Sequence, residues 1–136
     1  LKVVEEFGYE MYMHCGAIRK VLLAWQTPAF IDEYFKNIIL HDQAFPHVRP
    51  DDLREELKKI RQDGYAITHG EYVTDALGIG APVFNSDGEL AGSIGIIAPE
   101  IRVDTPEFLD TQKDLVQFYA SSLSADLGYE KHDVFQ

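Results

Sequence analysis

The most constraining part of this chain is residues 61–99, where a helix end, a single strand and a glycine-bearing β-hairpin follow one another. The strands of the hairpin are expected at Leu77–Phe84 and Leu90–Ala98. Between them lies Asn85-Ser86-Asp87-Gly88, whose residue types favour a tight turn. A shorter strand, Tyr65–His69, precedes the hairpin. Because strands joined by short connections pair side by side, this region predicts an antiparallel sheet.

Four helices are expected around this sheet, because apolar residues recur there every three or four positions. They are expected at residues 14–26, 27–39, 50–64 and 105–128, and two short strands are expected within residues 1–13. Thr27 and Thr105 each precede a proline, a pattern typical of a helix start. The broad apolar stripe of the second helix, which includes Phe30, predicts that this helix is well packed. The pattern as a whole predicts an α+β domain whose antiparallel sheet is covered by helices.

Size and composition limit the possible functions. A chain of 136 residues, 46% of them hydrophobic, suits one compact domain. Its 23 acidic and 12 basic side chains give a formal charge of −11, which argues against a nucleic-acid surface on this domain. The single cysteine excludes an internal disulfide and favours a cytoplasmic location. No apolar run reaches the roughly 20 residues that cross a bilayer, and no leader is visible, so no membrane partner is expected.

Two blocks of this sequence resemble the ligand-sensing domain of the IclR family of transcription regulators. One is Met13–Ala24, MHCGAIRKVLLA, which is similar to the family segment L-H-A-T-A-x-G-K-A-L-L-A. The other is a series of short motifs with the family's order and spacing: Arg61, Gly64-Tyr65, Gly70-Glu71-Tyr72, Ala81-Pro82-Val83-Phe84, Asp87-Gly88 and Ala98-Pro99. The resemblance extends over residues 3–130, nearly the whole chain.

The resemblance implies a fold similar to the GAF domain, with a ligand pocket between the sheet and its loops. It implies that residues 1–136 form an effector-binding and oligomerisation domain that lacks the family's amino-terminal winged helix-turn-helix and its first sheet strands. The expected effector is a small carboxylate or aromatic acid, with no cofactor. The expected assembly is a dimer or tetramer that contacts operator DNA only through the missing domain. No catalytic activity is expected.

Glycines within or beside the hairpin strands bear on the pocket, because glycine in a strand marks a bulge or the close approach of another group. Gly78, Gly80, Gly92 and Gly95 therefore indicate either a ligand surface or bulges and a tight helix contact, and both remain open. The resemblance implies the following pocket positions, with Cys15 added because it lies near them in sequence: Val3, Met11, Cys15, Ala17, Ile18, Thr68, Ala76, Gly78, Gly95 and Ile97.

Three features bear on the charge of the ligand. The first helix starts near small residues, and such a helix start favours an anion. Thr68 stands where the family often has an acidic residue, and its neutral hydroxyl is compatible with a carboxylate. Arg19 stands where the family usually has glycine, so its side chain either meets an acidic ligand or, as we favour, turns outward to solvent. His69 is expected on the opposite side of the strand from Thr68, exposed.

Other functions fit the residues less well. Cys15 beside His14 provides a thiol and an imidazole, but nothing in the sequence supplies an orienting third group, which argues against a nucleophilic enzyme. His14, Cys15 and His69 are weak metal-ligand candidates, because they lack a familiar ligand spacing. A freestanding GAF-like module that binds a small molecule or a metal outside transcription remains the alternative. An upstream winged helix-turn-helix would decide for the regulator.

Overall fold

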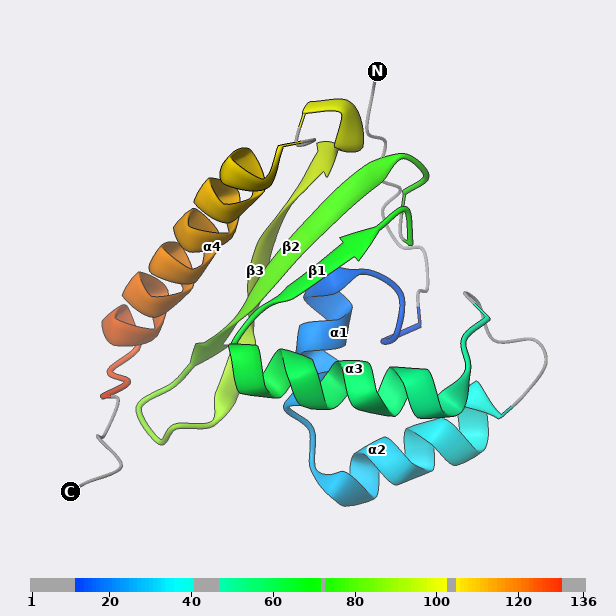
Figure 1. The fold of residues 1–136 in the computed structure, drawn as a ribbon. Helices are drawn as coiled ribbons and strands as arrows, with labels where there is room; N and C mark the ends of the chain where they lie inside the picture. Colours follow the sequence, from blue (N-terminus) through cyan, green and yellow to red (C-terminus); the bar gives the residue numbers. More distant parts are fainter. Residues whose placement is uncertain (1–11, 41–46, 72, 103–104, 131–136) are drawn as a thin grey trace.

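The computed structural model describes residues 12–40, 47–71, 73–102 and 105–130. Within them the helices and strands, in chain order, are α1 (Ala17–Ala24), α2 (Pro28–Tyr34), α3 (Pro50–Asp63), β1 (Ala66–His69), β2 (Ala76–Phe84), β3 (Leu90–Pro99) and α4 (Pro106–Asp126). A π-helical turn, Phe35–Ile39, continues α2, and a 3-10 turn, Glu100–Arg102, follows β3. The described strands form one antiparallel sheet in the order β1-β2-β3 (Figure 1). This confirms the predicted α+β fold.

Local chemistry explains the boundaries of several elements. The side chains of Thr27 and Thr105 accept hydrogen bonds from the backbone N–H groups of residues three positions later, at 3.1 and 3.2 Å, and so cap α2 and α4. In the hairpin turn, the Asn85 side chain accepts hydrogen bonds from the backbone N–H groups of Asp87 and Glu89. These are the positions at which the sequence predicted helix starts and a turn.

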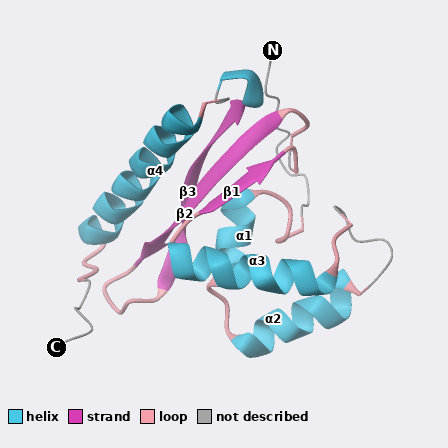
Figure 2. Cartoon of the chain, in the orientation of Figure 1, coloured by secondary structure: helices cyan, strands magenta, loops and turns pink. Residues whose placement is uncertain are grey.

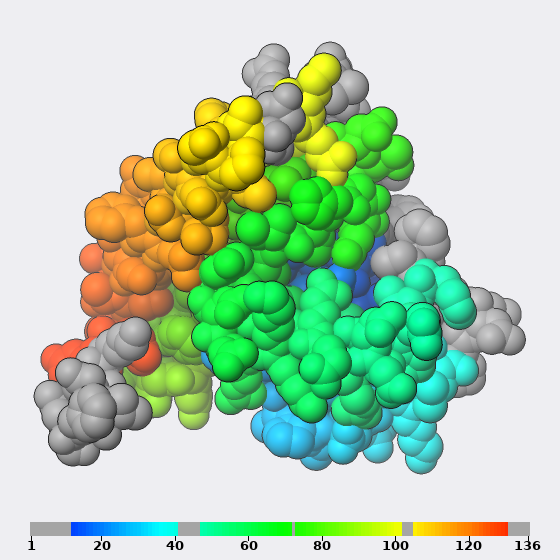
Figure 3. All heavy atoms as spheres, in the orientation of Figure 1, coloured from blue at the N-terminus to red at the C-terminus, as the bar shows by residue number. Residues whose placement is uncertain are grey.

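Helices cover the sheet on two faces. The helix α4 lies along one face, and α1 lies against the other, with α3 and α2 beyond it (Figures 1 and 2). In the space-filling view α4 forms one flank of the molecule, and a small area of α1 is visible between the strands and α3 (Figure 3). Side chains alternate along β2, so its residues Leu77, Ile79, Ala81 and Val83 pack against Val116 and Ala120 of α4. Gly78 and Gly80, which alternate with them, lie against Ala17 of α1.

The helix α1 approaches the sheet closely where two glycines pair across β2 and β3. A Cβ atom added to Gly80 would lie 3.1 Å from backbone atoms of Ala17 and Ile18. A Cβ added to Gly95 would collide with the Ile79 carbonyl oxygen and lie 2.9 Å from Cγ1 of Ile18. At Gly80 the tight helix contact explains the glycine. At Gly95 the nearer obstacle is the Ile79 carbonyl oxygen of β2, and the Ile18 side chain of α1 comes second; nothing lies within 4 Å of a Cβ added to Gly92.

Two predictions need correction or fall outside the described residues. No residue of α2 is buried, and Phe30 is 43% exposed, so the expected tight packing is wrong for the first half of the helix predicted at residues 27–39. Burial begins only in the following turn, at Phe35 and Ile39, because α2 lies outside α3 rather than against the sheet. The two strands predicted within residues 1–13 lie almost wholly outside the described residues. Among the described helices, none has the length and apolar character needed to span a membrane.

Candidate functional site

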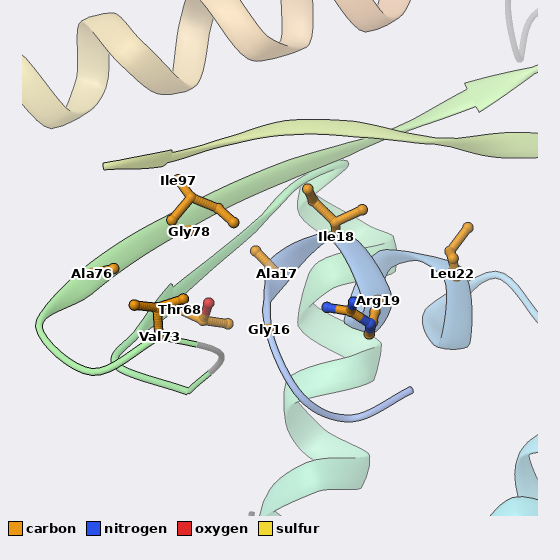
Figure 4. Close-up of a pocket in the computed structure, with 10 residues that line it drawn as sticks. All are labelled: Gly16, Ala17, Ile18, Arg19, Leu22, Thr68, Val73, Ala76, Gly78 and Ile97. Carbon is orange, nitrogen blue, oxygen red and sulfur yellow. The ribbon is translucent and has the colours of Figure 1, made fainter. Parts of the chain in front are cut away.

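A cavity of about 290 Å³ lies between the first turn of α1 and one end of the sheet (Figure 4). Its wall is made of Gly16, Ala17, Ile18, Arg19, Leu22, Thr68, Val73, Ala76, Gly78 and Ile97. These residues come from α1, from all three strands and from the connection between β1 and β2. Six of the pocket positions named from the sequence are in this wall: Ala17, Ile18, Thr68, Ala76, Gly78 and Ile97.

Small side chains keep this space open. Thr68 and Gly78 are paired across β1 and β2, and a Cβ added to Gly78 would lie 3.0 Å from the Thr68 Oγ1 atom and 3.4 Å from the Ala17 Cβ atom. Thr68 is buried, with its hydroxyl on the cavity side of the strand. Any larger residue at position 78 would therefore occupy the space between β2 and the helix start, which makes Gly78 a boundary of the cavity.

Other predicted pocket positions lie elsewhere. Gly95 packs against Ile18 and does not belong to the cavity wall. Cys15 is fully buried, and its Sγ atom donates a hydrogen bond to the Glu71 carbonyl oxygen at 3.2 Å. Burial raises the pKa of the Cys15 thiol, and the nearby Glu71 carboxylate raises it further. This environment disfavours a reactive thiolate. Val3 and Met11 lie outside the described residues.

Arg19 differs from its predicted orientation. The sequence favoured a side chain turned outward to solvent, whereas Arg19 is partly buried and contributes to the cavity wall. Figure 4 shows it projecting from the first turn of α1, beside the Gly16 segment. Among the ten residues of this wall, Arg19 carries the one formal charge, and that charge is positive.

A buried ion cluster next to the cavity was missed from the sequence. The Lys20 side chain is 2% exposed, and its Nζ atom lies 2.8 Å from both carboxylate oxygens of Glu56 and 2.8 Å from Oε2 of Glu71. Glu56 belongs to α3, and Glu71 to the connection between β1 and β2. A signal was present, because Lys20 shares the buried helical face of Ala17, Val21 and Ala24. A lysine on such a face needs an acidic partner.

His14 and His69 each contact a different side chain. His14 is buried, and its Nδ1 atom lies 2.8 Å from the Tyr34 hydroxyl oxygen. The His69 side chain is exposed, as predicted, and its Nδ1 atom lies 3.0 Å from Oε1 of Glu100. In the parts of the chain that the structure describes, no group of three His, Cys, Asp or Glu residues is arranged to hold a metal ion.

Sequence comparison identifies relatives along nearly the whole chain. The family model for the C-terminal domain of the bacterial transcriptional regulator IclR matches residues 1–125. The uncharacterized HTH-type transcriptional regulator RhmR of Escherichia coli K12 is 30% identical over 125 residues, which cover 90% of this chain and 47% of RhmR. The probable HTH-type transcriptional regulator ArcR of Halobacterium salinarum is 30% identical over 121 residues, 85% of this chain and 44% of ArcR. The chain therefore spans slightly less than half the length of these relatives.

Structural comparison gives the same result. The crystal structure of Thermotoga maritima IclR is similar to this chain with a TM-score of 0.78 and 27% identity, over 93% of this chain and 51% of that one. The C-terminal domain of the E. coli regulator KdgR is similar in fold, with a TM-score of 0.72 and 24% identity over 86% of this chain and 71% of that one. These relatives and structural neighbours are transcription regulators and not enzymes.

Proposed function

Because the chain belongs to the IclR family of bacterial transcription regulators, we propose that it is the ligand-sensing and oligomerisation domain of such a regulator. The cavity beside α1 is the observation that carries this proposal. A small carboxylate or aromatic acid binds there and changes DNA binding by an amino-terminal domain, in the cytoplasm. The regulator names of the relatives favour this function over that of a freestanding module.

The composition of the cavity wall favours a small anion. The first turn of α1, residues 16–19, forms part of the wall, and the N-terminus of a helix attracts negative charge. Arg19 adds a positive charge, Thr68 offers a hydroxyl, and none of the ten described wall residues is acidic. The remaining residues are apolar. A volume near the lower end of the range for small-ligand pockets, roughly 300–1,000 Å³, favours a compact acid.

The outer face of α4 supports self-association. Apolar side chains that are 40–59% exposed recur along the helix at intervals of seven or four residues: Phe108, Leu115, Tyr119, Leu123 and Leu127. Such a stripe is typical of a helix that packs against another surface. In the proposed dimer or tetramer a second copy covers it. The effector shifts the balance between two arrangements of copies through unequal affinity for them.

Thermal-shift measurement with small acids tests the cavity. Propionate and benzoate are expected to raise the melting temperature of the wild-type domain. We expect Ala76→Leu, which places a larger side chain in the cavity wall, to remove this effect. Gly92→Ala, which adds a methyl group in open space, should retain it and serves as the control. Equal stabilisation of all three proteins by the acids would place the ligand elsewhere.

Light scattering tests the oligomerisation surface. Leu123→Glu places a charge in the α4 stripe and should lower the mass of the assembly. The matched control is Ser121→Glu, because Ser121 is exposed on the same helix but lies outside the stripe. An unchanged mass for Leu123→Glu would exclude α4 as the subunit contact.

A further inference from the structure

The buried ion cluster of Lys20, Glu56 and Glu71 ties three elements together beside the cavity. Lys20 comes from α1, Glu56 from α3 and Glu71 from the connection between β1 and β2. The carboxylates remain partly exposed, at 37% and 25%, whereas the Lys20 side chain is 2% exposed. A lysine this deeply buried is stable in its charged form only with close acidic partners, so Lys20 and the two carboxylates hold one another in place.

Glu71 reaches the helix start that borders the cavity. Its Oε1 atom accepts a hydrogen bond from the backbone N–H of Gly16 at 3.3 Å, and Gly16 is part of the cavity wall. Two residues after Glu71, Val73 forms another part of that wall. The Glu71 carboxylate therefore lies close to the first-turn N–H groups of α1, which in the proposed function bind an anionic ligand. Glu71 itself is not one of the wall residues.

The charge of Glu71 acts against an anionic ligand unless it is compensated. Two like charges several ångströms apart repel each other appreciably in a partly buried site, where the effective dielectric constant is far below that of water. Lys20 provides compensation at 2.8 Å from Oε2, a shorter contact than the 3.3 Å between Oε1 and the Gly16 nitrogen. This contact draws the carboxylate toward Lys20 and offsets part of its field at the cavity. Lys20 also pairs with Glu56, so its one positive charge is shared between two carboxylates.

We propose that Lys20 is a positioning residue that sets the preference of the cavity for anions. By holding Glu71 and offsetting part of its charge, it leaves the first turn of α1 able to accept the carboxylate of a small monocarboxylic acid. Lys20 acts through Glu71 and does not contact the ligand. This inference rests on the proposed function, because it concerns the ligand preference of the same cavity.

Paired ligands that differ only in charge test this role. We would measure the affinities for benzoate and benzamide, and for propionate and propionamide, by calorimetry on the wild type and on Lys20→Met, Glu71→Gln and the double variant. Lys20→Met is expected to weaken acid binding by about tenfold or more, since it leaves the Glu71 charge uncompensated. Amide binding should stay unchanged. The double variant should recover part of the acid affinity, because it also removes the Glu71 carboxylate, which contacts the helix start, while Glu56 stays without Lys20.

The remaining variants separate this role from a general structural one. Lys59→Met removes another ion-paired lysine, whose partner is Asp63 on the exposed side of α3, and should leave the acid-to-amide ratio unchanged. Glu71→Gln keeps the test informative if Lys20→Met fails to fold, because it should raise the acid-to-amide ratio of the folded protein. In a nitrogen–proton correlation spectrum, the Gly16 amide resonance should also move in Glu71→Gln.

The outcomes distinguish this inference from the proposed function. Equal weakening of acid and amide by Lys20→Met, or no rise of the ratio in Glu71→Gln, would overturn the positioning role of Lys20 while leaving an effector site in place. If neither the acids nor the amides bind the wild type at millimolar concentration, the proposed effector site and the role of Lys20 both fail.

Discussion

The two faces of the sheet differ in how they are filled. On the α4 face, Leu77, Ile79 and Val83 pack directly against Val116 and Ala120 in one apolar cluster. On the α1 face, the helix touches the strands closely at Gly80 and Gly95 but leaves a cavity beyond Gly78, next to the buried charge of Lys20. The comparison shows that one face is organised for packing. The other combines a tight contact with a small open space and a buried ion cluster.

The largest expected effect tests the tight contact on the α1 face. Gly95→Ala should lower the free energy of unfolding by about 3 kcal/mol or more, because the new Cβ meets the Ile79 carbonyl oxygen and the Ile18 side chain. Gly92→Ala in the same strand should change it by less than about 0.5 kcal/mol, since nothing lies near its Cβ. Urea denaturation measures both variants. Similar losses would mean that β2 and α1 do not crowd position 95 as closely as described.

The next effect concerns the packed face. The Ser124 hydroxyl accepts a hydrogen bond from the Phe84 N–H and donates one to the Ala120 carbonyl oxygen, both at 2.9 Å. Ser124→Ala leaves the Phe84 N–H without this acceptor and should cost about 1–2 kcal/mol of unfolding free energy. Ser121→Ala, at an exposed position of α4, is the control and should stay within about 0.5 kcal/mol. A neutral Ser124→Ala would show that the α4 face tolerates loss of this bond.

A pH-dependent effect sharpens the description of the α1 face. Because burial first, and Glu71 second, raise the folded-state pKa of Cys15, the folded protein retains the thiol proton at a pH where the unfolded chain loses it. Stability from this residue is fully present below the unfolded pKa, 9.0, and is lost as the pH rises from there through the folded pKa. The expected loss is about 1.4 kcal/mol per pH unit at most. Urea denaturation of the wild type and of Cys15→Ala at about pH 8, 9 and 10, on either side of the unfolded pKa, measures this loss of stability. A constant difference between them would contradict the raised pKa.

The smallest effect on stability is expected within the cavity. Thr68→Val keeps the shape of the side chain and removes a hydroxyl at the cavity wall, so the free energy of unfolding should change by less than about 0.5 kcal/mol. The stabilisation produced by benzoate should nevertheless decrease, because the ligand loses a hydrogen-bond partner. Thermal shifts with and without benzoate measure both quantities. Loss of stability without loss of ligand response would make Thr68 a packing residue.

Local features were predicted well because they depend on neighbouring residues. Thr27 and Thr105 cap their helices through N–H groups three positions away, and Asn85 organises the hairpin turn through Asp87 and Glu89. The strand alternation correctly predicted that His69 is exposed while Thr68 lies on the other side. Most of the cavity wall was also anticipated, but through the family resemblance and not through spacing alone.

Features that depend on distant residues were predicted poorly. The apolar stripe of α2 gave no information about which element would cover it, and Phe30 remains exposed. The glycines of the hairpin indicated a close approach, but the sequence could not say whether a helix or a ligand approaches. Lys20 has partners 36 and 51 positions away, so their contact depends on how α3 and the β1–β2 connection fold back onto α1.

The sequence by itself determined the helix starts, the hairpin, the α+β class and the family, because capping, turn chemistry and side-chain periodicity act over a few residues. The tertiary structure alone decided that β2 and α1 crowd Gly95 while Gly78 borders a cavity, and that Lys20 lies between Glu56 and Glu71. The physical reason is that steric contact and charge compensation depend on distances in space. Those distances exist only after the elements have packed together.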